Sequence, residues 1–116
     1  MVVEDHTEAR AAMLLLLEAE GYDAVGAVDG QEGLDHLRRE GASLILLDLM
    51  LPHKNGAEFR AEQLRDSALA AIPVIVISAA DNVADKAAGL GVKDYLPKPL
   101  DVDLLLPLVA RYCPKA

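Results

Sequence analysis

Apolar and polar positions along the chain form short apolar runs that alternate with longer amphipathic segments. The strand-like runs are residues 1–3, 22–28, 43–49, 73–78 and 92–97. The helix-like segments are residues 5–21, 29–41, 57–68, 81–91 and 101–113. In the first of these, Thr7 is expected to cap a helix and Gly21 to end it. The pattern predicts strands and helices in strict alternation.

The third and fourth strand-like runs, "SLILLDL" and "PVIVIS", are almost continuously apolar and do not alternate with polar residues. A strand of this kind is typical of a sheet that is covered on both faces. Strands alternating with helices favour right-handed crossovers, and therefore a parallel sheet with helices on both sides. The predicted fold class is α/β.

Polar residues end or directly follow the predicted strands. A charged side chain buried there without a partner would cost free energy, so these positions call for an explanation. Glu4 and Asp5 follow the first strand, Asp48 lies near the end of the third, Ser78 ends the fourth and Lys98 follows the fifth. Ligands of open α/β sheets bind outside the carboxyl ends of the strands. We therefore expect these five residues to gather at one edge of the sheet.

Composition and charge narrow the function classes. The chain has 116 residues, enough for one domain with its own core, and only 3% of them are aromatic. A net charge of −8 and a pI near 4.7 argue against direct binding of nucleic acid. The single cysteine, Cys113, cannot form an internal disulfide, and no apolar stretch is long enough to span a bilayer. A cytoplasmic protein that does not insert into membranes is expected.

The five residues at the edge have a chemistry in common. Three carboxylates gathered together repel one another, and a divalent cation relieves that repulsion. Oxygen ligands suit Mg²⁺ better than Zn²⁺. An aspartate can act as a nucleophile and form an acyl phosphate. The pattern predicts that Asp48 attacks phosphorus while Mg²⁺, Lys98 and Ser78 spread the developing negative charge.

Four segments, in order and with the usual spacing, resemble one known family. They are "VVEDH" at the start, "LLDLMLPHKNG" in the middle, "VIVISA" at the fourth strand and "DYLPKPL" near the end. The chain resembles a bacterial two-component response-regulator receiver domain over essentially all of residues 1–116. The resemblance implies a flavodoxin-like fold with five parallel strands in the order 2-1-3-4-5.

The resemblance also implies roles for individual residues. Asp48 would be the phosphorylated residue, and Asp5, Glu4 and the backbone carbonyl of Met50 would complete the Mg²⁺ site with it. Ser78 is similar to the family's switch hydroxyl, and Tyr95 is similar to its switch aromatic. The Lys98–Pro99 peptide bond would be cis. Enzymatic activity is expected only on the chain's own Asp48, as self-phosphorylation and self-dephosphorylation.

The partners implied are a sensor histidine kinase or a histidine phosphotransfer protein, and a downstream protein target. Whether phosphorylation drives homodimerisation stays open, as does the presence of a separate output domain in a longer regulator.

A scaffold that binds partners regardless of phosphorylation is an alternative interpretation. A flavin protein or an aspartyl-nucleophile hydrolase ranks last, because the turn after the first strand lacks a phosphate cradle and no carboxylate lies two residues after Asp48.

Two further expectations concern the surroundings of Asp48. Met50 and Ala80 occupy the variable positions that flank the phosphorylation site in the family, and neither side chain can position water, so slow self-dephosphorylation is expected. His6, His36 and His53 lie on separate segments without a shared ligand spacing, and we expect all three on the surface.

Overall fold

The computed structural model describes residues 1–79 and 81–114. Five parallel strands form one sheet in the order β2-β1-β3-β4-β5, which confirms the fold and strand order expected. The strands are β1 (Val2–Val3), β2 (Gly26–Ala27), β3 (Ile45–Asp48), β4 (Val74–Ser78) and β5 (Asp94–Pro97). The helices are α1 (Thr7–Ala19), α2 (Gly30–Glu40), α3 (Gly56–Arg65), α4 (Val83–Gly89) and α5 (Val102–Tyr112).

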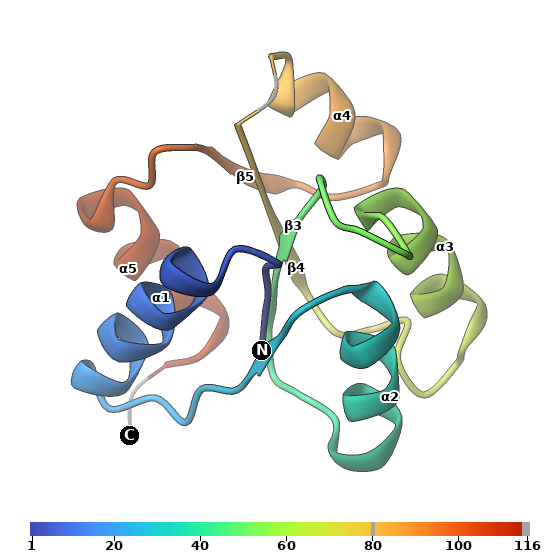
Figure 1. The fold of residues 1–116 in the computed structure, drawn as a ribbon, viewed down its shortest axis with the longest axis horizontal. Coiled ribbons are helices and arrows are strands. Elements are labelled where there is room, and N and C mark those ends of the chain that lie inside the picture. The colour runs from blue at the N-terminus through green and yellow to red at the C-terminus, as the bar shows by residue number, and fades with distance from the viewer. Residues whose placement is uncertain (80, 115–116) are drawn as a thin grey trace.

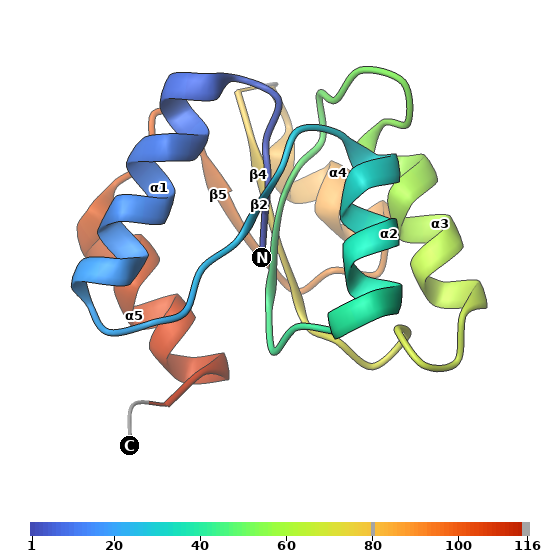
Figure 2. The same cartoon turned by 60° about the horizontal axis from the view of Figure 1, so that its bottom comes forward.

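Helices cover both faces of the sheet, with α1 and α5 on one side and α2, α3 and α4 on the other (Figure 1; Figure 2). Each face has its own core. Phe59 of α3 and Leu34 of α2 are fully buried on one side, and Leu105 of α5 is fully buried on the other. Burial on both faces explains why β3 and β4 are continuously apolar.

Several elements are shorter than predicted: of residues 22–28 only Gly26–Ala27 form a strand, and α4 covers Val83–Gly89 and not residues 81–91. At two other helix boundaries the hydrogen bonds show the local cause of the difference. The N-cap of α1 is His6, whose Nδ1 accepts a hydrogen bond from Ala9 N at 3.3 Å, while Thr7 is the first helical residue. α3 ends at Arg65 and not near residue 68, because the carboxylate of Asp66 accepts from Ala68 N at 3.0 Å and stabilises a turn there. These side chains compete with the backbone in a way that hydrophobic periodicity does not record.

The parallel arrangement brings the carboxyl ends of the strands to one edge, and that edge carries the predicted polar residues. Asp48 pairs in register with Ile77, so Ser78 lies one residue further along β4. Ser78 in turn pairs with Pro97, which immediately precedes Lys98. Among the described residues, no helix is long and apolar enough to cross a membrane.

Candidate functional site

An acidic cluster lies at the carboxyl edge of the sheet. Glu4, Asp5 and Asp48 each offer one oxygen, and these oxygens all lie within 4.8 Å of one another. Glu4 and Asp48 are 2% and 5% exposed, whereas Asp5 is exposed to solvent. Two carboxylates are therefore removed from water, and the third opens the cluster to it.

Lys98 neutralises part of this charge. Its Nζ donates to Asp48 Oδ2 at 2.7 Å and to Glu4 Oε1. The loop after β5 holds the lysine in place, since Lys98 N donates to Ser78 O at 3.0 Å. The Lys98–Pro99 peptide is cis, as expected. One ammonium thus bridges the ends of β1 and β3.

The electrostatics follow from three carboxylates and one nearby cation. Burial raises the pKa of the Glu4 carboxyl, and the neighbouring Asp48 raises it further, although the Lys98 ammonium and the His6 N–H act in the opposite direction. Burial alone would lower the pKa of Lys98, but its hydrogen bonds to Asp48 and Glu4 outweigh this effect and raise it. The lysine is held in its charged form, and the cluster still lacks positive charge.

The backbone beyond β3 holds Asp48 from the other side. Met50 N donates to Asp48 Oδ1 at 2.9 Å, and the Met50 side chain is 65% exposed. The loop folds back tightly at Gly56, whose N donates to Leu49 O at 3.2 Å. A Cβ on Gly56 would lie 2.7 Å from Leu49 Cα, so only glycine allows this approach.

Ser78 and Tyr95 complete the set of predicted site residues. Ser78 is fully buried at the end of β4, next to the loop that carries Lys98. Tyr95 lies on β5 with 41% of its surface exposed. Ala80, the other position expected to affect hydrolysis, lies outside the described residues.

The donor set fits a hard divalent cation. The three clustered side chains offer only oxygen ligands, and none of the nearby described residues adds a thiol. Exposure of Asp5 leaves room for water ligands, which Mg²⁺ retains in most protein sites. Three carboxylates share the single ammonium of Lys98, so positive charge is short in the cluster. Mg²⁺ would remove this shortage.

Sequence reasoning missed one residue that supports the acidic cluster. Arg10, on the first turns of α1, donates from one guanidinium nitrogen to Glu4 O at 2.9 Å and to Asp5 O at 3.4 Å. It therefore holds the backbone of both acids. Its position about one turn into the helix that follows the acid pair was the available signal, but the rotation of the helix relative to the strand decides the contact.

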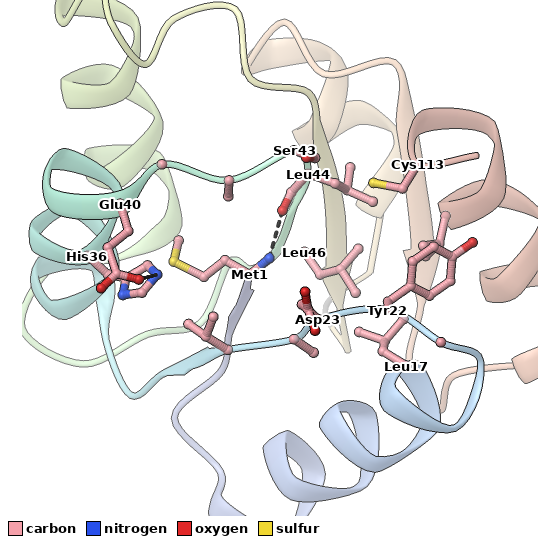
Figure 3. Close-up of a pocket in the computed structure, with 16 residues that line it drawn as sticks. Met1, Leu17, Tyr22, Asp23, His36, Glu40, Ser43, Leu44, Leu46 and Cys113 are labelled. Atoms are coloured by element: carbon pink, nitrogen blue, oxygen red, sulfur yellow. Dashed lines mark hydrogen bonds and ion pairs between the residues drawn. The ribbon is translucent and has the colours of Figure 1, made fainter. Parts of the chain in front are cut away.

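The histidine rings are not part of the cluster of Glu4, Asp5 and Asp48, and one histidine differs from the prediction. His6 and His53 are exposed as expected, but the His36 side chain is only 17% exposed. His36 lines a separate cavity of about 420 Å³ at the amino ends of the strands, where its Nε2 lies 3.8 Å from Glu40 Oε2 (Figure 3). This cavity contains none of the predicted site residues.

Comparisons with known proteins agree on one family. The family model described as "Response regulator receiver domain" matches residues 1–110. The transcriptional regulatory protein YkoG of Bacillus subtilis is 40% identical over 109 residues, which are 91% of this chain and 46% of YkoG. Protein PilH of Pseudomonas aeruginosa is 32% identical over 91% of this chain and 89% of its own length.

The fold comparison is equally consistent. The crystal structure of a response regulator receiver protein from Pseudomonas putida superposes with a TM-score of 0.87 and 33% identity, covering 95% of this chain and 93% of the other. The chain spans less than half the length of several curated relatives, 46% of YkoG among them.

Proposed function

The chain belongs to the response-regulator receiver domain family of two-component signalling, and from this premise we propose that Asp48 accepts a phosphoryl group from a phosphohistidine. The observation that carries the proposal is the position of Asp48. It ends a buried strand between the Met50 N–H and the Lys98 ammonium, within a cluster of three carboxylates. Three carboxylates beside one ammonium repel one another, and a bound divalent cation with a phosphoryl group at Asp48 would offset that cost.

In the proposed reaction, a carboxylate oxygen of Asp48 attacks phosphorus. A bond from phosphorus to this oxygen forms while the bond from phosphorus to the donor's imidazole nitrogen breaks, and the imidazole leaves with the electron pair. Lys98 orients Asp48 and lies where a cation can pair with a phosphoryl oxygen. The Ser78 hydroxyl is proposed to donate to a further phosphoryl oxygen.

Mg²⁺ is the proposed cofactor. Glu4, Asp5, Asp48 and the carbonyl of Met50 would hold it, with Glu4 acting through water. When bound, it neutralises phosphoryl oxygens that the carboxylates would otherwise repel. Arg10 contributes by fixing the backbone of Glu4 and Asp5.

The phosphodonor is proposed to be a sensor histidine kinase or a histidine phosphotransfer protein that docks beside the site. An apolar groove of about 470 Å³ runs between α1 and the start of α5, lined by Ala12, Leu16 and Leu100 among others. Glu4 and Lys98 form part of its wall, so a protein seated there lies next to Asp48. Continuity between groove and site supports a protein donor.

A variant on the rim of the groove separates docking from chemistry. Ala12→Glu should slow transfer from a phosphorylated histidine phosphotransfer domain that labels the wild type, but should not slow labelling by a small phosphodonor. Ala19→Glu, on the same helix and outside the groove, is the matched control. Equal slowing with both donors would place the defect in the site instead.

The output is proposed to be a changed protein surface. Added charge at the strand edge would draw Ser78 toward the phosphoryl group and rearrange Tyr95, α4, β5 and α5. A downstream protein, or a second phosphorylated copy of the chain, would read this surface. Because several relatives are about twice as long, an output domain in a longer regulator is part of the proposal, and so is the cytoplasmic location usual for the family.

Activity is proposed to be confined to the chain's own Asp48, with slow self-dephosphorylation. The exposed Met50 side chain has no polar group that could orient an attacking water. Met50→Glu should therefore shorten the lifetime of the phosphorylated protein in Mg²⁺ buffer. Rapid loss of the phosphoryl group from the wild type would contradict the proposal.

Intact-protein mass spectrometry after incubation with acetyl phosphate and Mg²⁺ tests the phosphoacceptor function. We expect a gain of one phosphoryl group that is absent after chelation and absent in Asp48→Ala. Asp85→Ala, at an exposed carboxylate on α4, is the control and should be labelled normally. No gain in the folded wild type would favour the phosphorylation-independent scaffold.

A further inference from the structure

A hydrogen-bond network that runs from the buried Gln63 to the surface joins α3 to the loop after α4, away from the acidic cluster. Arg60 of α3 donates from Nε to Leu90 O at 3.0 Å and from a terminal nitrogen to Gly91 O at 3.2 Å. Its other terminal nitrogen donates to Gln63 Oε1 at 2.9 Å. The guanidinium thus contacts two successive carbonyls just beyond the carboxyl end of α4.

Gln63 fixes the arginine in turn. Its side chain is fully buried, and its Nε2 donates to Leu69 O at 3.1 Å and to Ile72 O at 3.0 Å. A buried amide with its donors and acceptor satisfied has one favoured orientation. Gln63 therefore holds Arg60 against the loop, and α3 braces the end of α4.

The two ends of α4 differ sharply. At its carboxyl end, Val92 N donates to Ala87 O at 2.9 Å and Gly91 N to Ala88 O at 3.0 Å, with Gly91 at a φ of 71°. This is a Schellman motif, and the Arg60 guanidinium adds a cation at the negative end of the helix dipole.

At the amino end of α4, Asn82 has a φ of 60° and makes no side-chain capping bond. Among the helices of the described residues, the other four each have an N-cap side chain that accepts from the backbone. α4 is also the shortest of them, with seven residues, of which Val83 and Ala87 are buried. Because no capping side chain holds this end, it should open at lower cost than a capped helix end.

We propose that Arg60, oriented by Gln63, pins the carboxyl end of α4, so that α4 opens and moves from its amino end. This anchoring of Leu90 O and Gly91 O by Arg60, called the pin below, is proposed for the unphosphorylated chain. Its role in signalling rests on the proposed function, because the amino end of α4 follows the loop after Ser78, whereas the pinned end leads into β5. A pinned helix would convert a small movement at Ser78 into a rotation of α4 about Leu90.

Hydrogen exchange resolved by residue tests the pin in the unphosphorylated chain. In the wild type we expect the amides of Gly91 and Val92 to exchange more slowly than that of Lys86, which donates to Asn82 O. Arg60→Met keeps the apolar stem and removes the donors. It should speed exchange of Gly91 and Val92 at least about tenfold, the size expected for losing a charge-assisted hydrogen bond.

Arg65→Met is the matched control, since Arg65 is an exposed arginine on the same helix, and it should leave both amides unchanged. Should Arg60→Met fail to fold, Arg60→Lys keeps one cation without the planar fork, and an intermediate acceleration is expected. Exchange in the Arg60 variant equal to that in the Arg65 variant, or slower exchange at Lys86 than at Val92 in the wild type, would overturn the pin.

A phosphorylated sample tests the signalling role separately. In the wild type, exchange should change more over residues 83–86 than over residues 90–92, and in Arg60→Met the change should spread to both. Equal changes in exchange at both ends of wild-type α4 would contradict the proposed rotation of α4 about Leu90. If the wild type takes up no phosphoryl group, the proposed function fails, while exchange in the unphosphorylated chain still decides the pin.

Discussion

Removing the Lys98 ammonium should destabilise the protein, and Mg²⁺ should compensate for much of the loss. Lys98 bridges Asp48 and Glu4, whose side chains are 6% and 2% exposed, and is itself 25% exposed. Breaking a fully buried ion pair by deleting one partner costs about 3–5 kcal/mol. Because Lys98 is partly solvated, we expect Lys98→Met to lower the free energy of unfolding by about 2–3 kcal/mol without Mg²⁺.

The Mg²⁺ dependence carries the sharper prediction. A ligand at about 100 times its Kd stabilises the folded state by about 2.7 kcal/mol. Without the competing ammonium, the acidic cluster should bind Mg²⁺ more tightly, so the gain in stability on adding Mg²⁺ should be larger in the variant than in the wild type. The difference in stability between the two proteins should therefore narrow as Mg²⁺ is raised.

Urea denaturation followed by far-UV circular dichroism suits a chain without tryptophan. Wild type and variant are compared with EDTA and across a Mg²⁺ titration. Lys86→Met, at an exposed lysine on α4, is the control and should change stability by less than about 0.5 kcal/mol. A Lys98 variant as stable as the wild type in EDTA, or a deficit that Mg²⁺ leaves unchanged, would refute the electrostatic reasoning.

Two further predictions concern the helices that frame the site. The Asp29 carboxylate caps α2 by accepting from Glu32 N at 2.8 Å, so Asp29→Ala should cost about 1 kcal/mol at neutral pH. This hydrogen bond, with His53 nearby, holds the pKa of Asp29 below its usual 3.8, so the stabilisation is present above that pH and is lost as pH falls through the lowered value. Urea denaturation at several pH values should show a difference in the free energy of unfolding between wild type and Asp29→Ala that decreases as the pH falls. A difference independent of pH would contradict this cause. Gly30→Ala should lower the denaturation midpoint, because its Cβ would lie 2.5 Å from Lys54 O, whereas Gly89→Ala, with open space around it, should be neutral or stabilising.

Much of the fold was predictable because its signals are local. The unbroken apolar runs of β3 and β4 indicated a sheet covered on both faces, and the strand-end rule then placed Glu4, Asp48 and Lys98 at one edge. The strand order itself came from the family resemblance. Periodicity alone would not have distinguished it from other parallel orders.

What was not predictable depends on tertiary packing. Lys98 contacts Glu4 across 94 positions of sequence as well as Asp48, and Arg10 holds the carbonyls of the acid pair. Arg60 resembles an ordinary surface arginine on α3 until the fold brings the end of α4 to it. His6 capped α1 in place of Thr7 because the choice between neighbouring caps depends on backbone angles.

The most direct test of the central claim is to identify the residue that carries the phosphoryl group. An acyl phosphate is reduced by borohydride to an alcohol, so peptide mass spectrometry of the reduced, labelled protein locates it as homoserine in place of aspartate. The account predicts homoserine at residue 48 alone, dependent on both Mg²⁺ and phosphodonor. Reduction at Glu4 or Asp5, or none in a labelled sample, would contradict it.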